Sequence, residues 1–167
     1  MRFNSKMFVA VALGAIVLGA QAPAAYAAAS GMASMNFMLG TWQCSSKALD
    51  GSTIHTTLVT RLSNDGTRMV TRDSQGDGTT TMWWDATKKQ WMQTTATSKG
   101  SGVQTSPGWT GNSLVFVGTQ EVNGVPVGFR NTTTKVSDTQ IQAMDELSPP
   151  STSQWVTIDT TVCAKAH

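Results

Sequence analysis

The feature that most constrains the fold is a succession of about ten short segments rich in threonine, valine, tryptophan, phenylalanine and isoleucine, separated by glycine, asparagine, aspartate or proline. Such segments are typical of short antiparallel strands, and helical periodicity is almost absent. Asn123-Gly124, which lies between two apolar runs, is the strongest hairpin signal. We therefore predict an all-β chain in which each strand pairs with the next. The predicted strands cover residues 38–46, 53–62, 67–74, 79–85, 90–97, 103–108, 113–122, 125–136, 139–147 and 153–164.

Two cysteines predict that this meander closes on itself. Cys44 lies in the first predicted strand and Cys163 in the last. A disulfide requires Cα atoms within about 7 Å, and the first and last strands of a meander meet only when it forms a barrel. Closure also removes the two exposed edges of an open sheet. We expect a closed up-and-down antiparallel barrel with a Cys44–Cys163 disulfide, the alternative being two buried free thiols.

The N-terminal residues have the pattern of a secretory signal peptide. Arg2 and Lys6 precede an uncharged apolar run at residues 7–20, and residues 25–27 read Ala-Tyr-Ala, a small-x-small cleavage pattern. The apolar run is shorter than the roughly 20 residues of a membrane-spanning helix. We expect residues 1–27 to be removed, with export to the periplasm or the cell exterior and no membrane span in the remaining chain.

The remaining chain is predicted to be one domain without net charge. Residues 28–36 are expected to form a short lead-in or a plug for the barrel, and residues 37–167 the barrel itself. Without Arg2 and Lys6, ten basic residues balance ten acidic ones. A neutral chain with scattered charges lacks the basic surface that nucleic acid or an anionic membrane would require.

Three segments carry a resemblance to a known group of proteins. Residues 37–42 read Phe-Met-Leu-Gly-Thr-Trp, and this Gly-x-Trp before the first strand resembles the opening signature of the lipocalin-like (calycin) barrels. Residues 82–91 and 108–116 are similar to internal hairpins of uncharacterised exported bacterial lipocalin-like proteins. The resemblance implies that Trp42 packs at the closed end of the barrel, with Lys165 as a substitute for the arginine that covers this tryptophan in lipocalins. The Thr-Asp-Tyr-type motif and the C-terminal helix of lipocalins are missing.

Large side chains on the predicted strands are candidates for a ligand-binding interior. A barrel of about ten strands is usually wider than its side chains can fill, which is an argument for a cavity. Each ring could equally fill the core. Trp83 and Trp84 are consecutive, so one should face in and the other out. The candidate residues are Trp42, Trp84, Trp91, Phe116, Phe129, Arg130 and Trp155.

Residues with metal-binding or catalytic chemistry are few. Met32, Met35 and Met38 recur every third residue before the first strand. We interpret them as flexible apolar side chains that plug one mouth of the barrel, with a thioether site for Cu(I) as the alternative. His55 has no fixed partner, and we expect it at the surface if Ile54 and its apolar neighbours face inward. We therefore predict no catalytic residue, no metal site and no cofactor.

The sequence favours a small-molecule binding protein over an enzyme. No nucleophile motif is present, and two neighbouring carboxylates, Asp145 and Glu146, should point to opposite faces of a strand. The leading prediction is an exported, non-enzymatic barrel that holds a small molecule in its interior. An isomerase-like or cyclase-like enzyme would instead need a buried acid or histidine with a displaced pKa. An envelope interaction domain with a filled core would need a contiguous exposed apolar patch.

Overall fold

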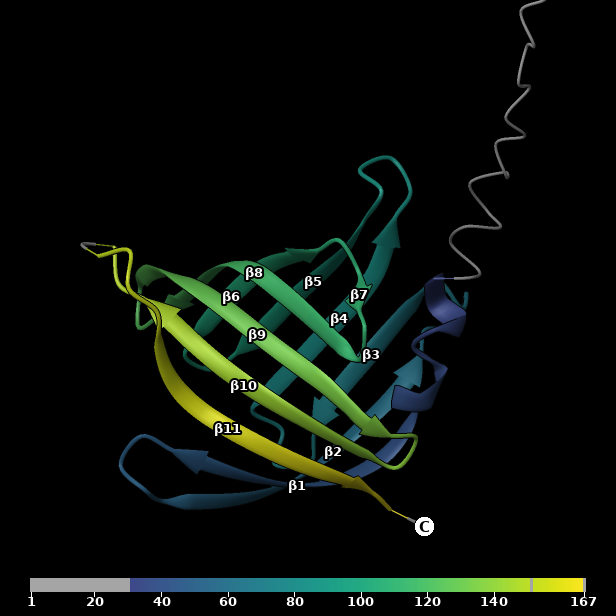
Figure 1. Ribbon diagram of the computed structural model, residues 1–167, viewed down its shortest axis with the longest axis horizontal. Coiled ribbons are helices and arrows are strands. Elements are labelled where there is room, and N and C mark those ends of the chain that lie inside the picture. Colours follow the sequence, from purple (N-terminus) through teal and green to yellow (C-terminus); the bar gives the residue numbers. More distant parts are fainter. Residues whose placement is uncertain (1–30, 151, 167) are drawn as a thin grey trace, which may run out of the picture.

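The computed structural model describes residues 31–150 and 152–166, so the predicted signal peptide lies outside the described residues. One antiparallel sheet curves into a barrel (Figure 1). A short 3₁₀ helix, η1 (Asn36–Met38), precedes the first strand. The strands are β1 (Gly40–Ala48), β2 (Thr53–Leu62), β3 (Arg68–Asp73), β4 (Gly78–Asp85), β5 (Gln90–Thr97), β6 (Gly100–Ser106), β7 (Trp109–Thr110), β8 (Ser113–Val122), β9 (Val125–Ser137), β10 (Gln140–Ser148) and β11 (Val156–Lys165).

Ten of these strands form a closed wall, as the sequence predicts. The sheet order is β6-β5-β4-β3-β2-β1-β11-β10-β9-β8-β7, and an additional β6–β8 pairing joins the two sides. The two-residue strand β7, which the sequence does not predict, pairs only with β8. The all-β, closed antiparallel fold is therefore confirmed.

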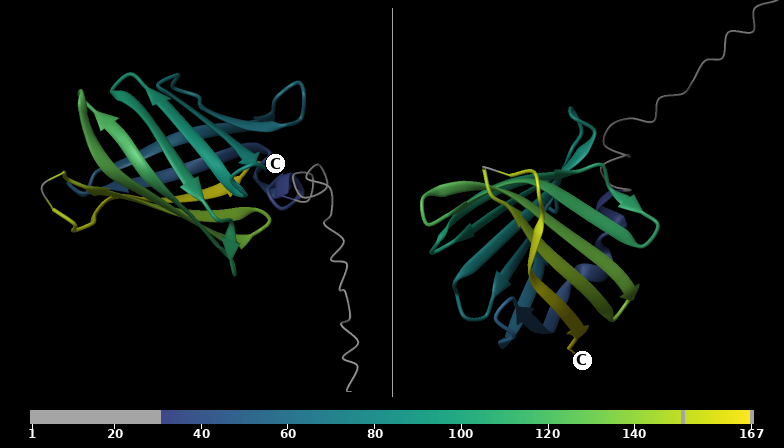
Figure 2. Two further views of the ribbon diagram at one scale, coloured as in Figure 1. Left: turned by 90° about the horizontal axis from the view of Figure 1, so that it is seen from above. Right: turned by 60° about the vertical axis from the view of Figure 1, so that its left-hand side comes forward.

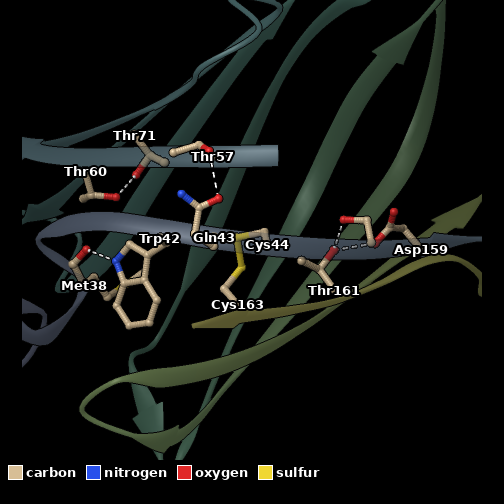
Figure 3. The surroundings of a disulfide bond; sticks show 11 residues. Met38, Trp42, Gln43, Cys44, Thr57, Thr60, Thr71, Asp159, Thr161 and Cys163 are labelled. Atoms are coloured by element: carbon tan, nitrogen blue, oxygen red, sulfur yellow. Dashed lines mark hydrogen bonds between the residues drawn. A yellow bond between two sulfur atoms is a disulfide. The ribbon is translucent and has the colours of Figure 1, made fainter. Parts of the chain in front are cut away.

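The first and last strands of the chain are joined by the predicted disulfide. Cys44 and Cys163 lie directly opposite each other in the β1–β11 ladder, with 4.1 Å between their Cα atoms and 119 residues between them in sequence. Both cysteines are buried on the inner face, beside Trp42 and Ile141. Figure 3 shows the disulfide bridging the two neighbouring strands.

The closure between β6 and β8 depends on glycine. A Cβ atom at Gly118 would lie 2.1 Å from the carbonyl oxygen of Val103, and one at Gly102 would lie 2.8 Å from that of Thr119. Such close approach of two backbones is a position where only glycine fits. It also explains why β6 begins at Gly100, three residues before the predicted strand: these glycines form a strand instead of a turn.

Paired residues across the ladders show which side chains face the interior. Directly opposite residues of antiparallel strands share a face, and the face alternates along each strand. Starting from buried Trp42 and Cys44, this rule places Leu58, Met69 and Met82 inside. His55 pairs with Ser45 on the outer face and is exposed, as expected from the alternation.

Apolar side chains fill one end of the barrel. Six buried residues form the main core cluster, and Met32, Met38, Leu39, Trp84 and Trp109 pack against it. The buried residues are Met35, Met69, Met82, Trp91, Leu114 and Phe116. Figure 2 shows the N-terminal turn at this end of the barrel and the residues that link β10 to β11 at the other. The segment that precedes β1 thus supplies Met35, which is fully buried, to the core.

Candidate functional site on the inner wall

A polar cluster occupies the inner wall of the barrel where β9, β10, β11 and β1 run side by side. The register pairs Asn131 with Asp145, and Asp145 with Asp159. Ser46 of β1 lies opposite Thr161 of β11. These side chains share the inner face with Cys44 and Cys163. We call this set the inner-wall cluster: Ser46, Asn131, Thr133, Asp145, Asp159 and Thr161.

An irregularity in β11 lies directly beside the two carboxylates. Asp145 lies opposite Asp159, whereas the next residue, Glu146, lies opposite Thr157. Ile158 is therefore an extra residue in β11, as in a β-bulge, and bulges commonly re-aim side chains beside functional sites. The ladder is regular from Ile141 and Cys163 to the two carboxylates, and the bulge changes the pairing only from Glu146 onward.

Two separate series of hydrogen bonds link the side chains of the cluster. Thr133 donates to Asn131 Oδ1 at 3.1 Å, and the Asn131 amide donates to Asp145 Oδ1 at 2.6 Å. The hydroxyl groups of Ser46 and Thr161 are 2.6 Å apart, and Thr161 donates to Asp159 Oδ1 at 2.7 Å. The second series of hydrogen bonds is visible beside the disulfide in Figure 3. Each carboxylate thus receives one hydrogen bond and keeps further acceptor positions.

Asp145 is the titratable group whose environment is most unusual. Burial raises the pKa of Asp145 to about 6, and the negative charge of Asp159 acts in the same direction. The hydrogen bond from Asn131 opposes this rise, because it stabilises the charged form. Asp145 therefore exchanges its proton near neutral pH, where it can either accept or donate a hydrogen bond.

Within the described residues, two lysines on the inner face lie where the N-terminal segment packs against the barrel, which we call the plugged end, and both have partners there. Lys165 donates to the Phe37 carbonyl oxygen at 3.0 Å, and its amine lies 5.5 Å from the Trp42 ring centre. Lys135 lies 4.4 Å from the Phe37 ring centre and 2.6 Å from Asp138. Both ammonium groups therefore interact with residues at the end of the barrel where the N-terminal segment packs.

The seven residues that the sequence nominated for the interior fall into three places. Trp42, Trp91 and Phe116 are buried in the two apolar clusters, and Trp84 packs on Trp91 with 5.8 Å between ring centres. Phe129 lies opposite Gly118 and Leu147, on the inner face of the other end. The remaining two, Arg130 and Trp155, lie on the outer side.

The outward placement of Arg130 and Trp155 differs from the expectation and has a simple reason. Arg130 follows inward-facing Phe129, so alternation turns it outward. It forms a two-pronged ion pair with Glu146, with 2.6 Å between Nη2 and Oε1, and its guanidinium lies 4.6 Å from the Trp155 ring centre. The bond from Arg130 also holds the pKa of Glu146 below its usual value. This group stabilises the outer wall, and Asp145 and Glu146 do face opposite ways.

The sequence missed the inner-wall cluster. Its members come from four strands, and the sequence does not show that they lie together. The alternation Asn131-x-Thr133 and Asp159-x-Thr161 is a polar signal on one face of two strands, but it identifies a site only once the ladders are aligned. Within residues 31–150 and 152–166, no group of three or more histidine, cysteine, aspartate or glutamate side chains could hold a metal ion.

The fold and the cluster define a class of protein: a ten-stranded, disulfide-closed antiparallel β-barrel with a polar site on its inner wall. No family model and no curated protein matches the chain. Among solved structures it is similar to a protein of unknown function from the DUF3598 family of Nostoc punctiforme PCC 73102, with 16% identity and a TM-score of 0.41. The match covers 79% of this chain and 48% of the other, so the chain spans about half the length of that protein. Among the described residues, no helix has the length and apolar character needed to cross a membrane.

Proposed function

We propose that this protein is an exported, non-enzymatic, lipocalin-like barrel that binds a small polar molecule at the inner-wall cluster. The ligand would sit between the apolar plug and the opposite mouth, with Asp145 and Asp159 as hydrogen-bond acceptors. Its chemistry would be that of a small donor-rich or cationic molecule, since two carboxylates share this part of the wall.

One observation carries the proposal: three polar side chains on the inner face of β9, β10 and β11 stay partly exposed, whereas the apolar side chains of the main core cluster are buried. Phe116 and Met69 face inward at the plugged end and are each 1% exposed. Asn131, Asp145 and Asp159 also face inward but stay partly exposed. An interior filled by its own side chains would leave such residues as buried as Phe116. Their partial exposure is what a reachable interior surface would produce.

Contacts at the plugged end support the lipocalin-like part of the proposal. Trp42 opens the first strand, is buried at the end closed by the N-terminal segment, and donates its indole hydrogen bond to the Met38 carbonyl oxygen at 2.8 Å. Lys165 lies over this ring, in the role that the resemblance assigns to a basic residue near the last strand. The signal-peptide pattern of residues 1–27 and the Cys44–Cys163 disulfide support export.

The experiment that tests this proposal is a nuclear magnetic resonance screen of small amines, polyols and amides against the ¹⁵N-labelled protein. A ligand of the proposed site shifts the backbone amides of Asn131, Asp145 and Asp159, and its affinity falls at least tenfold in D145N/D159N. The matched control is E121Q, which changes an exposed carboxylate. Hits that map only to the outer wall, or that bind D145N/D159N as well as the wild type, would refute the proposal.

The raised pKa of Asp145 favours one second candidate, an enzyme on the same barrel. A carboxyl group that titrates near pH 6 is suited to general acid–base chemistry, such as the proton transfer of an isomerase or cyclase. This candidate predicts that an NMR hit is converted to a product by the wild type. D145N would then abolish turnover while retaining binding, whereas a carrier returns every hit unchanged.

A further inference from the structure

Five methionines from three parts of the chain gather at the plugged end of the barrel. Met35, Met69 and Met82 are buried in one cluster, and Met32 and Met38 pack against it. The remaining two methionines of the described chain lie elsewhere: Met92 and Met144 are on the outer face. Within the described residues, methionine is therefore concentrated at this end of the barrel.

The geometry of the N-terminal segment aligns its three methionines on one side. The Met35 amide donates to the Met32 carbonyl oxygen at 3.0 Å, and the Met38 amide donates to that of Met35 at 2.9 Å. Successive bonds of this i→i+3 type stack residues three apart along one side of the segment. That side faces the barrel mouth, because Met35 is fully buried.

The opposite half of the cluster comes from the barrel wall. Met69 of β3 and Met82 of β4 are directly paired, and both face inward. Cβ atoms of such a pair are about 5 Å apart, so the two thioethers lie side by side on the inner wall, and both side chains belong to the same buried cluster as Met35. Leucine would serve as well as methionine for apolar packing alone, and the cluster does contain Leu114. Five methionines at one place give this cluster a soft-ligand chemistry that leucine would not supply.

We propose that Met35, Met69 and Met82, joined by Met32 or Met38, form a thioether site for a soft monovalent metal ion of the Cu(I) class. Thioether sulfur is a neutral, polarisable ligand that selects Cu(I) over hard divalent ions. Met32 and Met38 are only partly buried, so they provide the route by which an ion reaches the buried sulfurs. Trp91 lies in the same cluster and Trp84 packs on it, and their rings offer cation–π stabilisation in an otherwise apolar surrounding.

The test is titration of the intact purified protein with Ag(I), a redox-inert stand-in for Cu(I), followed by intrinsic tryptophan fluorescence and calorimetry. The proposal predicts one tight equivalent, quenching through Trp91, and selective shifts of the Met35, Met69 and Met82 methyl signals in ¹³C-methyl-methionine spectra. M69L and M82L, which nearly conserve side-chain volume, should each weaken Ag(I) at least tenfold, since even loss of an outer-shell partner commonly weakens a metal by 10–100-fold.

The control for this titration is M92L/M144L, which removes the two methionines that lie outside the cluster within the described residues. It should bind Ag(I) as the wild type does. Thermal unfolding of each variant without metal shows that the barrel is intact, and M35L provides an independent test from the N-terminal segment. Equal Ag(I) affinity in the wild type, M69L and M82L, or no binding by the wild type, would overturn the proposal.

Discussion

Removal of the disulfide is the perturbation whose effect is best fixed by this structure. The Cys44–Cys163 bond closes a loop of 119 residues, which is nearly the whole described chain. In the chain-entropy model, a loop of this length stabilises the folded state by about 5 kcal/mol, because the cross-link removes conformations from the unfolded chain. A domain is typically stable by about 5–15 kcal/mol. The disulfide therefore supplies a large share of the free energy of unfolding.

The variant C44A/C163A should lose about 5 kcal/mol of unfolding free energy and about 15 °C in Tm. Both cysteines are buried, so the alanine variant also loses sulfur contacts with Trp42 and Ile141. Wild type reduced with a phosphine separates the two effects, since it keeps the sulfur atoms and lacks only the cross-link. Urea unfolding followed by circular dichroism should show a larger m-value for both, because a chain without the cross-link exposes more surface when unfolded.

A loss of less than about 1 kcal/mol in the reduced wild type would refute this prediction. In that case the hydrogen-bonded β1–β11 ladder would hold the barrel closed by itself. A loss confined to C44A/C163A would show that packing of the sulfur atoms, and not loop closure, is the source of the stability.

Three further predictions concern the inner wall, the outer wall and the seam. Because burial raises the pKa of Asp145 to about 6 from 3.8, its contribution to stability is present below about pH 4 and is lost as the pH rises through 6. Urea unfolding at several pH values should thus show D145N gaining about 2 kcal/mol on the wild type between pH 4 and pH 8, and a constant difference would contradict this account. On the outer wall, E146A should lose about 2 kcal/mol because it leaves a half-buried guanidinium unpaired, whereas K88A, at an exposed ion pair, should lose less than about 0.5 kcal/mol. Where β6 pairs with β8, G118A should lose about 3 kcal/mol or more of unfolding free energy and speed hydrogen exchange in both strands. G78A should be tolerated, because a Cβ atom at Gly78 would lie 3.9 Å from its nearest neighbour, a methyl carbon of Thr97. Equal losses of stability in G118A and G78A would refute the close-approach argument.

The strands were predictable because their signals are local. The structure places β2, β5 and β8 at residues 53–62, 90–97 and 113–122, the same ranges that the sequence predicts. Asn123 and Gly124 both have positive φ, at 52° and 81°, as the predicted tight hairpin requires. Barrel closure was also predictable, since one pair of cysteines near the two ends of the chain carries long-range information.

The site was not predictable because its information is non-local. Asp145 meets Asn131 and Asp159 only through two ladders, and no local sequence pattern specifies the register of either ladder. The sequence also nominated both Phe129 and Arg130 for the interior, although consecutive strand residues face opposite sides. Which of them faces inward follows from buried Gln104 and Phe116, which fix the inner face of β8 beside them.

The most direct test of the proposed carrier function is native mass spectrometry of the protein isolated from the exported fraction of cells that produce it. We expect a mature mass lacking residues 1–27 and two hydrogens, with a small adduct that is lost on denaturation and is absent from D145N/D159N. The same adduct on wild type and D145N/D159N, or a wild type without any adduct when isolated gently at neutral pH, would contradict a ligand held by Asp145 and Asp159.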